Sequence, residues 1–234
     1  MSKRIKIIGA GIFGCAIGYE LHRAGHAVTI IEQDSDIMQH ASRANHNRLH
    51  LGYHYPRSLE TAEQSLKGLV SFLTNYREAI VSHFPNYYMI AKNNSQTSAK
   101  EYIEFCNAAN IDYTYEMPSE RLVNQQLIDL SVNTLKSKVK KLIKGIDIKF
   151  NTEFDGDISD CDYLINATYA NMNKVNEILG VPTIKLKLQD VAVPHFKMDS
   201  EPFGLTIMDG PFCSIMPKGN NPNERQQIRY RYDI

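Results

Sequence analysis

Residues 4–32 read RIKIIGAGIFGCAIGYELHRAGHAVTIIE, and this stretch decides the fold. Residues 4–8 are rich in isoleucine, which predicts a short buried strand. Small and apolar side chains then recur every three to four positions over 13–24, which predicts a helix that ends at Gly25. A second apolar strand is predicted over 27–31. Strand, helix and strand in this order predict a βαβ unit, whose crossover is right-handed by the general rule.

The turn between the first strand and the helix is GAGIFG, residues 9–14, a G-x-G-x-x-G pattern in the context that it requires. Gly9 permits the tight turn, Gly11 lets a pyrophosphate approach the backbone, and Gly14 lets the helix lie close to the strand. N–H groups at the start of the helix then face the phosphates. The pattern predicts a Rossmann-type dinucleotide site, and a glycine-rich turn in an α/β protein without a ligand is the less favoured alternative.

Glu32 lies at the end of the second predicted strand. A carboxylate at this position accepts hydrogen bonds from the two ribose hydroxyls of an adenosine. It would repel a 2′-phosphate, so NADP is disfavoured. FAD and NAD share their ADP half, so the first 32 residues do not separate these two cofactors.

The rest of the chain continues the α/β pattern and becomes β-rich after Pro182. Residues 33–57 show no periodicity, and a loop of this length inside a domain is usually functional. Helices are predicted over 58–83, 98–109, 120–143 and 171–179, and strands over 87–91, 111–115, 146–150, 163–167, 184–196, 204–208 and 212–216.

These elements predict an α/β fold with two domains. The first is a Rossmann-type nucleotide-binding domain, and the second is a smaller β-rich domain on the substrate side. We expect the first domain in 1–83 and 144–182, the substrate or cap domain in 84–143 and 183–217, and a polar tail in 218–234.

The composition is that of an ordinary globular protein. Of 234 residues, 43% are hydrophobic and 22% are charged, and 26 basic residues balance 26 acidic ones. This balance gives no argument for a nucleic-acid partner or for a strongly charged membrane surface. The sequence has no apolar run of transmembrane length and no recognisable signal peptide, so we expect no integral membrane segment and a cytoplasmic location.

The four cysteines form no Cys-x-x-Cys pair, so we expect free thiols. Cys15 lies near the start of the first helix, where a thiolate would be stabilised. Packing of a small side chain near the cofactor is the favoured interpretation of this residue.

Residues 40–58, HASRANHNRLHLGYHYPRS, resemble the FAD-dependent oxidoreductases of the D-amino-acid-oxidase (DAO) type. This superfamily includes glycine oxidases, glycerol-3-phosphate dehydrogenases and L-2-hydroxyglutarate dehydrogenases, and the last branch is the most similar. A second similar stretch is DCDYLINAT, residues 160–168, after which the family has a glycine and this chain has Tyr169. The first stretch shares a His-Asn run, a His-x-Gly-x-x-Tyr element and a Pro and Ser that open a helix, here His46, Asn47, His50, Gly52, Tyr55, Pro56 and Ser58.

The resemblance implies FAD as the cofactor and a Rossmann-type domain with a smaller β-rich substrate domain. The strand that ends in Ala-Thr returns to the cofactor in such flavoproteins. The motif and the resemblance together predict these cofactor-binding residues: Gly9, Gly11, Ile12, Phe13, Gly14, Glu32, Gln33, Ser42, Arg43, Asn45, His46, Asn47, Ala167 and Thr168.

The implied reaction is oxidation of a CH–OH or CH–NH group by hydride transfer to the flavin. A base that titrates near neutrality suits such a step, which makes His50 and His54 candidates for catalysis. Arg48 and Arg57 could clamp a substrate carboxylate through paired hydrogen bonds. Three alternatives stay open: these residues only pack the loop and position FAD, the chain is a non-catalytic or truncated nucleotide-binding remnant, or it is an NAD-dependent dehydrogenase.

A metal site is the weaker interpretation of the histidines. His46, His50 and His54 would share one face of a helix, but Gly52 and Pro56 make a helix unfavourable here. No acid or cysteine follows at ligand spacing, so no metal is expected.

Members of the D-amino-acid-oxidase family, which this sequence resembles, usually continue with more sheet and a final glycine-bearing segment that completes the flavin site. Nothing after Pro217 is similar to that segment. We therefore expect a truncated chain of marginal stability, with a tendency to self-associate through an open sheet edge. The alternative is a short family member with a solvated tail.

Overall fold

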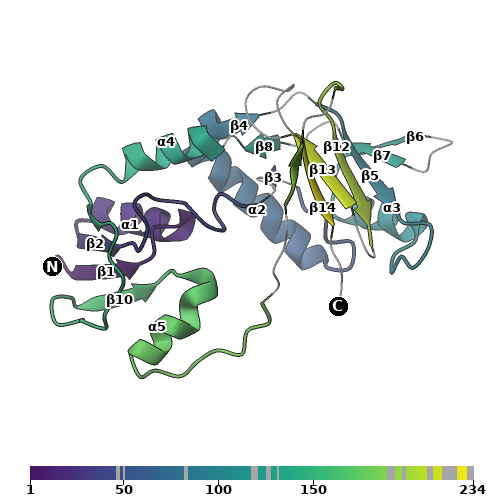
Figure 1. Cartoon of the computed structure of the whole chain (residues 1–234). Coiled ribbons are helices and arrows are strands. Elements are labelled where there is room, and N and C mark those ends of the chain that lie inside the picture. Colours follow the sequence, from purple (N-terminus) through teal and green to yellow (C-terminus); the bar gives the residue numbers. More distant parts are fainter. Residues whose placement is uncertain are drawn as a thin grey trace. The chain divides into compact units, whose positions relative to one another are not determined.

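The computed structural model describes residues 1–45, 48–49, 51–81, 84–116, 121–124, 128–130, 132–188, 193–196, 199–209, 213–217 and 226–230. Two compact units divide the chain. The first comprises residues 1–45 and 136–190, and the second comprises residues 46–135 and 191–234. Figure 1 labels the helices and strands of both units.

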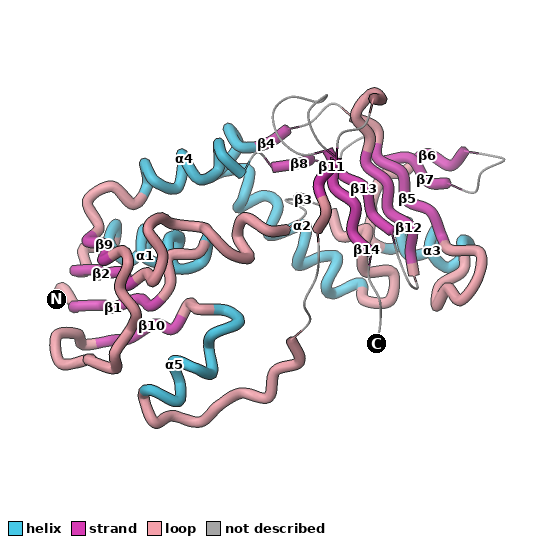
Figure 2. Tube along the Cα trace, viewed as in Figure 1, coloured by secondary structure: helices cyan, strands magenta, loops and turns pink. Residues whose placement is uncertain are grey.

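The first unit contains a parallel sheet whose four strands follow the order β10-β1-β2-β9. Figure 2 shows the strands in this order. Ile5 pairs with Val28 on one side and with Tyr163 on the other, so the parallel pairing predicted for the βαβ unit is confirmed. The strands are β1 (Arg4–Ile8), β2 (Ala27–Ile31), β9 (Asp147–Lys149) and β10 (Tyr163–Asn166).

Three helices belong wholly or partly to the first unit: α1 (Ile12–Arg23), α5 (Met172–Ile178) and the part of α4 (Val132–Leu142) that follows Leu135. A short 3-10 turn, η2 (Tyr169–Asn171), precedes α5. Gly18 of α1 lies directly over Ile7 and Ile30, where an added Cβ would be 3.1 Å from Ile30 Cδ1. Helix and sheet are therefore in close contact, and Ile7 and Ile30 are fully buried.

Lys6 is a charged residue inside an otherwise apolar strand, and its side chain is only 7% exposed. Its Nζ donates to the Asp157 carbonyl at 2.7 Å and forms an ion pair with Asp160 Oδ1 at 2.6 Å. These two acceptors compensate the loss of hydration, which explains how the strand keeps a lysine.

The second unit contains a sheet of seven strands with the order β11-β14-β13-β12-β5-β7-β6 and a small sheet with the order β3-β8-β4. Its helices are α2 (Leu59–Tyr76), which continues as the 3-10 turn η1 (Arg77–Ala79), and α3 (Ala99–Ala108). The strands of the unit are β3 (Arg48–Leu49), β4 (Ile80–Val81), β5 (Asn86–Ile90), β6 (Thr114–Glu116), β7 (Arg121–Asn124), β8 (Ile128–Leu130), β11 (His195–Phe196), β12 (Gly204–Met208), β13 (Cys213–Pro217) and β14 (Gln226–Tyr230).

The helices of the second unit begin at side-chain caps that the sequence encodes locally. Ser58 accepts a hydrogen bond from the Thr61 N–H at 3.3 Å, and Ser98 forms a complete capping box with Glu101. The apolar cluster of this unit includes the buried rings of Tyr53, Tyr88, Tyr102 and Phe105. The Tyr53 and Tyr88 rings stack with centroids 5.2 Å apart.

The helix predicted over 120–143 is wrong in its first half. Residues 121–124 form β7, which pairs antiparallel with β5, and residues 128–130 form β8, which pairs with β3 and β4. Among the residues of this range that the structure describes, only α4 is helical. β7 also pairs antiparallel with the neighbouring strand β6. The other partners, β5, β3 and β4, lie roughly 30 to 80 positions earlier in the chain, so local periodicity does not reveal those pairings.

Three further predictions need correction. The helix over 58–83 ends at Tyr76. Residues 184–188 form no strand, because the Asn173 side chain binds both the N–H and the carbonyl of Ile184 and ties the segment to α5. Residues 226–230, predicted as polar tail, form β14, which pairs antiparallel with β13 and β11.

The two compact units divide the chain at other positions than the expected domains. Residues 46–83 lie in the second unit. The reason is strand pairing, since β3 and β4 near the ends of this segment both pair with β8 of the second unit.

Candidate dinucleotide-binding site

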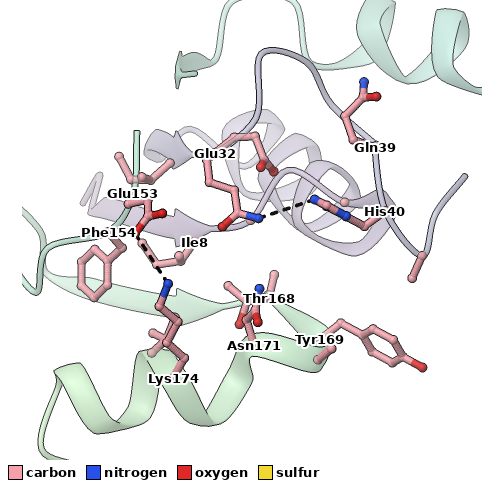
Figure 3. A pocket seen from close by; sticks show the side chains of 18 of the residues that line it. Ile8, Glu32, Gln39, His40, Glu153, Phe154, Thr168, Tyr169, Asn171 and Lys174 are labelled. Atoms are coloured by element: carbon pink, nitrogen blue, oxygen red, sulfur yellow. Dashed lines mark hydrogen bonds and ion pairs between the residues drawn. The ribbon is translucent and has the colours of Figure 1, made fainter. Parts of the chain in front are cut away.

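A cavity of about 390 Å³ lies in the first unit at the carboxyl ends of β1, β2 and β10. Ligands of open parallel sheets bind at this edge, and the volume lies in the range of small-molecule sites. The walls come from the glycine turn after β1, the end of β2, residues 39–42, residues 152–154, the turn 167–171 and helix α5. Figure 3 shows the labelled side chains that these segments contribute around the cavity.

The glycine turn holds the start of α1 against the sheet. Gly9 has φ +98°, in the left-handed region, and an added Cβ would lie 2.9 Å from the Ala167 carbonyl oxygen. A Cβ on Gly14 would lie 1.9 Å from the Gly9 carbonyl oxygen. Both positions therefore require glycine, and the close approach aims the N-terminus of α1 at the cavity.

Glu32 links the glycine turn to the end of β2. Its Oε2 accepts from the Ala10 N–H at 2.6 Å and its Oε1 accepts from the Asp34 N–H at 3.0 Å. The residue is 8% exposed and lines the cavity. A carboxylate offers about four lone-pair sites, so each oxygen retains capacity for a ribose hydroxyl.

Ser42 reaches the start of α1 from the loop after β2. Its Oγ accepts from the Ile12 N–H at 2.9 Å, and a Cβ on Gly11 would lie 3.3 Å from this oxygen. Ser42 and Gly11 both line the cavity. A hydroxyl and a helix N-terminus at one point form a site that suits a phosphate group.

The turn after β10 is held by the side chain of Asn166. Its Oδ1 accepts from Thr168 Oγ1 at 2.6 Å, and its Nδ2 donates to the Met172 carbonyl at 3.0 Å and to Asn176 Oδ1 at 3.1 Å. Tyr169, at the position where the resembling family has glycine, has φ +54°. The turn thus keeps a left-handed conformation although the residue carries a side chain.

The end of the cavity near α5 is apolar and is bordered by an ion pair. Phe154, Val175 and Ile178 line it. Glu153 and Lys174 point toward one another in Figure 3, with their charged atoms 3.5 Å apart. An apolar recess with a charged rim suits an adenine ring better than a phosphate.

The residues predicted to bind the cofactor lie on one side of this cavity, and the prediction named none on the other side. Thr152, Glu153, Phe154 and the α5 residues were not predicted, although the strand before them ends at the same edge of the sheet. The predicted residues that line the cavity are Gly9, Gly11, Glu32, Gln33, Ser42, Ala167 and Thr168, whereas Ile12, Phe13, Gly14, Arg43 and Asn45 do not line it. His46, Asn47 and His50 lie outside the described residues.

Cys15 is fully buried, and its Sγ donates to the Ala10 carbonyl at 3.4 Å. Burial, with the nearby Glu32 carboxylate, raises the pKa of the thiol to about 12. The thiol is therefore protonated near neutral pH, in agreement with a packing role.

Two of the predicted catalytic residues contact each other in the second unit. Arg48 Nη1 contacts His54 Nε2, and His54 Nδ1 lies 2.9 Å from the Tyr88 hydroxyl. Burial raises the pKa of the Tyr88 hydroxyl, although the Arg48 charge opposes the shift. A guanidinium only donates, so a hydrogen bond between these two groups requires His54 Nε2 as the acceptor.

Arg57 contacts a different group of residues in the same unit. It donates to Gln96 Oε1 at 2.5 Å and to Asp209 Oδ1 at 3.3 Å. Asp209 is 8% exposed and also accepts from Thr97 Oγ1 at 2.6 Å. Arg57 therefore already binds a carboxylate of its own unit, and its predicted role as a substrate clamp stays a prediction.

Comparison with known proteins also indicates FAD as the cofactor. The family model described as FAD dependent oxidoreductase (DAO) matches residues 4–130. The FAD-dependent monooxygenase kojA of Aspergillus flavus is 28% identical over 97% of this chain and 60% of its own length. The FAD-dependent monooxygenase FPY4 of Fusarium mangiferae is 32% identical over 90% of this chain and 60% of its own length. The chain thus spans about 60% of the length of these curated relatives.

Solved structures show the same fold. Glycine oxidase from Geobacillus kaustophilus superposes with a TM-score of 0.70 at 16% identity, over 99% of this chain and 74% of the other. L-alpha-glycerophosphate oxidase from Mycoplasma pneumoniae, solved with FAD bound, has a TM-score of 0.67 at 15% identity, over 99% of this chain and 71% of the other. In the described part of the chain, no helix combines the length and the hydrophobicity needed to cross a membrane.

Proposed function

Because the chain belongs to the family of FAD-dependent oxidoreductases, we propose that it oxidises a CH–OH or CH–NH group of a small substrate with FAD held in the cavity of the first unit. The observation that carries the proposal is the convergence of Glu32, Ser42 and the N-terminus of α1 on one cavity. Glu32 suits the ribose of an ADP moiety, and Ser42 with the N-terminus of α1 suits its pyrophosphate.

The residues fit the ADP half of FAD from one end of the cavity to the other. The apolar recess of Phe154, Val175 and Ile178 would hold the adenine, and Glu32 would accept from the ribose hydroxyls. The α1 N-terminus and the Ser42 hydroxyl would bind the pyrophosphate. When bound, FAD supplies the acceptor for the hydride.

The second unit would bind the substrate. Arg48 carries a fixed positive charge and suits a substrate carboxylate, while His54 and Tyr88 hold its side chain in place. His50 remains the candidate base that removes the substrate proton. A 2-hydroxy acid is the substrate class that the resemblance to the 2-hydroxyglutarate branch favours, and that branch stays a prediction. The cytoplasmic location and self-association also stay predictions.

The first experiment asks whether the purified 234-residue chain binds FAD. We expect a flavin absorbance spectrum after gentle purification, or quenching of FAD fluorescence on titration, and weaker binding by the variant Glu32→Gln. The matched control is Glu20→Gln, which changes an exposed carboxylate on α1 that does not line the cavity. A colourless protein that takes up no FAD and binds NAD instead would support the dehydrogenase alternative.

The second experiment tests the reaction. FAD-loaded protein is mixed anaerobically with 2-hydroxy acids, amino acids and polyol phosphates, and loss of the oxidised flavin absorbance is followed. Bleaching by one class identifies the substrate type. If FAD is bound and no compound reduces it, the remnant alternative is favoured. If a pyridine nucleotide, added as a further compound, is needed to reduce the flavin, and oxygen enters the product in a parallel aerobic reaction, the reaction matches the monooxygenase name that the fungal relatives carry.

A further inference from the structure

Tyr169 occupies a backbone conformation that its side chain disfavours. Its φ of +54° lies in the left-handed region, where the Cβ of a residue other than glycine approaches the following carbonyl. Asparagine tolerates this region because its short polar side chain can form local hydrogen bonds, whereas tyrosine has no such compensation. The strain must therefore be imposed by the surrounding turn.

The surrounding turn imposes it through Asn166, not through the tyrosine ring. Asn166 binds Thr168, the Met172 carbonyl and the Asn176 side chain, which spans the turn on both sides of Tyr169. The Tyr169 side chain itself is 70% exposed. A ring that is mostly in solvent gains little from burial, so the side chain adds little to the stability of the folded chain.

The position of Tyr169 points to a role in ligand binding. The residue lines the same cavity as Glu32 and Ser42. The apolar recess lies at the end of the cavity near Phe154 and Glu153, and Figure 3 shows Tyr169 at the opposite end. A dinucleotide whose adenine fills that recess extends toward Tyr169.

We propose that Tyr169 is a FAD-contacting residue, and that its exposed ring packs against the cofactor where the cofactor leaves the cavity. The inference rests on the proposed FAD site and adds one residue to it, at a position where the motif of the resembling family has no side chain. Contact with the ring removes water from both surfaces, and the gain on binding offsets the backbone strain that the free protein carries.

The test separates this role from a structural one, because the two effects of removing the side chain have opposite signs. Tyr169→Gly relieves the left-handed strain, so the apoprotein should melt at the same temperature as the original chain or higher. The same variant loses the ring, so the Kd for FAD should rise about threefold to tenfold, the range expected for one aromatic contact. Tyr169→Phe keeps the ring and should bind FAD like the original chain.

The control is Tyr163→Ala, which removes another exposed tyrosine, at the start of β10, that does not line the cavity. Its Kd for FAD should not change. Unchanged or tighter FAD binding by Tyr169→Gly would overturn the inference. An equal loss of FAD affinity in Tyr169→Phe would also overturn it, because that variant keeps the ring. So would a clear fall in the melting temperature of the Tyr169→Gly apoprotein together with its loss of affinity. If the original chain binds no FAD at all, the proposed function itself fails, and the inference fails with it.

Discussion

Replacing Gly14 by alanine should disrupt the first unit although the change adds one methyl group. The added Cβ would lie 1.9 Å from the Gly9 carbonyl oxygen, and ordinary contacts begin near 3.4 Å. The helix or the turn must therefore move by roughly 1.5 Å. Because the clash is with backbone, no side chain can rotate away to relieve it.

The expected magnitude follows from two opposing effects. Overpacking of this kind typically costs about 1–3 kcal/mol, and a clash with backbone belongs at the upper end. Alanine is favoured over glycine inside a helix by about 1 kcal/mol. We therefore expect Gly14→Ala to lower the free energy of unfolding by about 2 kcal/mol, and to raise the Kd for FAD at least tenfold because the shift displaces the α1 N-terminus.

Gly18→Ala is the matched control on the same helix. Its Cβ would lie 3.1 Å from Ile30 Cδ1, which is the tip of a flexible side chain. The small clash and the gain in helix propensity should nearly cancel, so we expect a change within about 1 kcal/mol. Urea unfolding followed by circular dichroism gives the stabilities, and FAD fluorescence gives the affinities. If Gly14→Ala is as stable as Gly18→Ala and binds FAD equally, the argument from close approach is refuted.

Three further predictions concern other parts of the chain. Gly68 lies on the exposed side of α2 with nothing within 4 Å of an added Cβ, so Gly68→Ala should raise the free energy of urea unfolding by about 0.5–1 kcal/mol; a decrease would show a contact that the structure lacks. Burial opposes ionisation of Asp36, but ion pairs with Lys136 and Lys140 outweigh it and lower its pKa to about 2. The ionised carboxylate therefore stabilises the fold at pH values above its unfolded-state pKa near 4, and this stabilisation is lost as the pH falls toward 2. Asp36→Asn should lower the free energy of unfolding by about 1–2 kcal/mol at pH 7, allowing for partial solvent exposure, and should weaken the acid dependence of unfolding between pH 4 and 2. An unchanged acid profile would contradict this. The Cys15 thiol, whose pKa burial raises to about 12, should react with a disulfide reagent at pH 8 about 100-fold more slowly in the folded chain than in urea, and equal rates by mass spectrometry would rule out its burial.

The sequence alone determined the βαβ unit and the residues that line one side of the cavity. The strand, the glycine turn, the helix and Glu32 lie within 29 consecutive residues, 4–32, and each is specified by local chemistry. Glycine is needed where a Cβ meets backbone, isoleucine repeats where a strand is buried, and an acid follows at the end of the second strand, at the edge of the cavity. The structure confirms the parallel pairing of Ile5 with Val28.

Only the tertiary structure decided the other half of the cavity and the division into two units. Phe154 and Lys174 reach the site because β9 and β10 add to opposite edges of the first sheet, which depends on pairing across more than 100 residues of chain, roughly. Residues 121–124 continue a helical pattern and residues 226–230 are mostly polar, yet both segments form strands because they pair with β5 and β13. Local periodicity records which face of an element is buried, whereas strand pairing and cavity walls depend on which distant segments meet, and that information is spread over the whole chain.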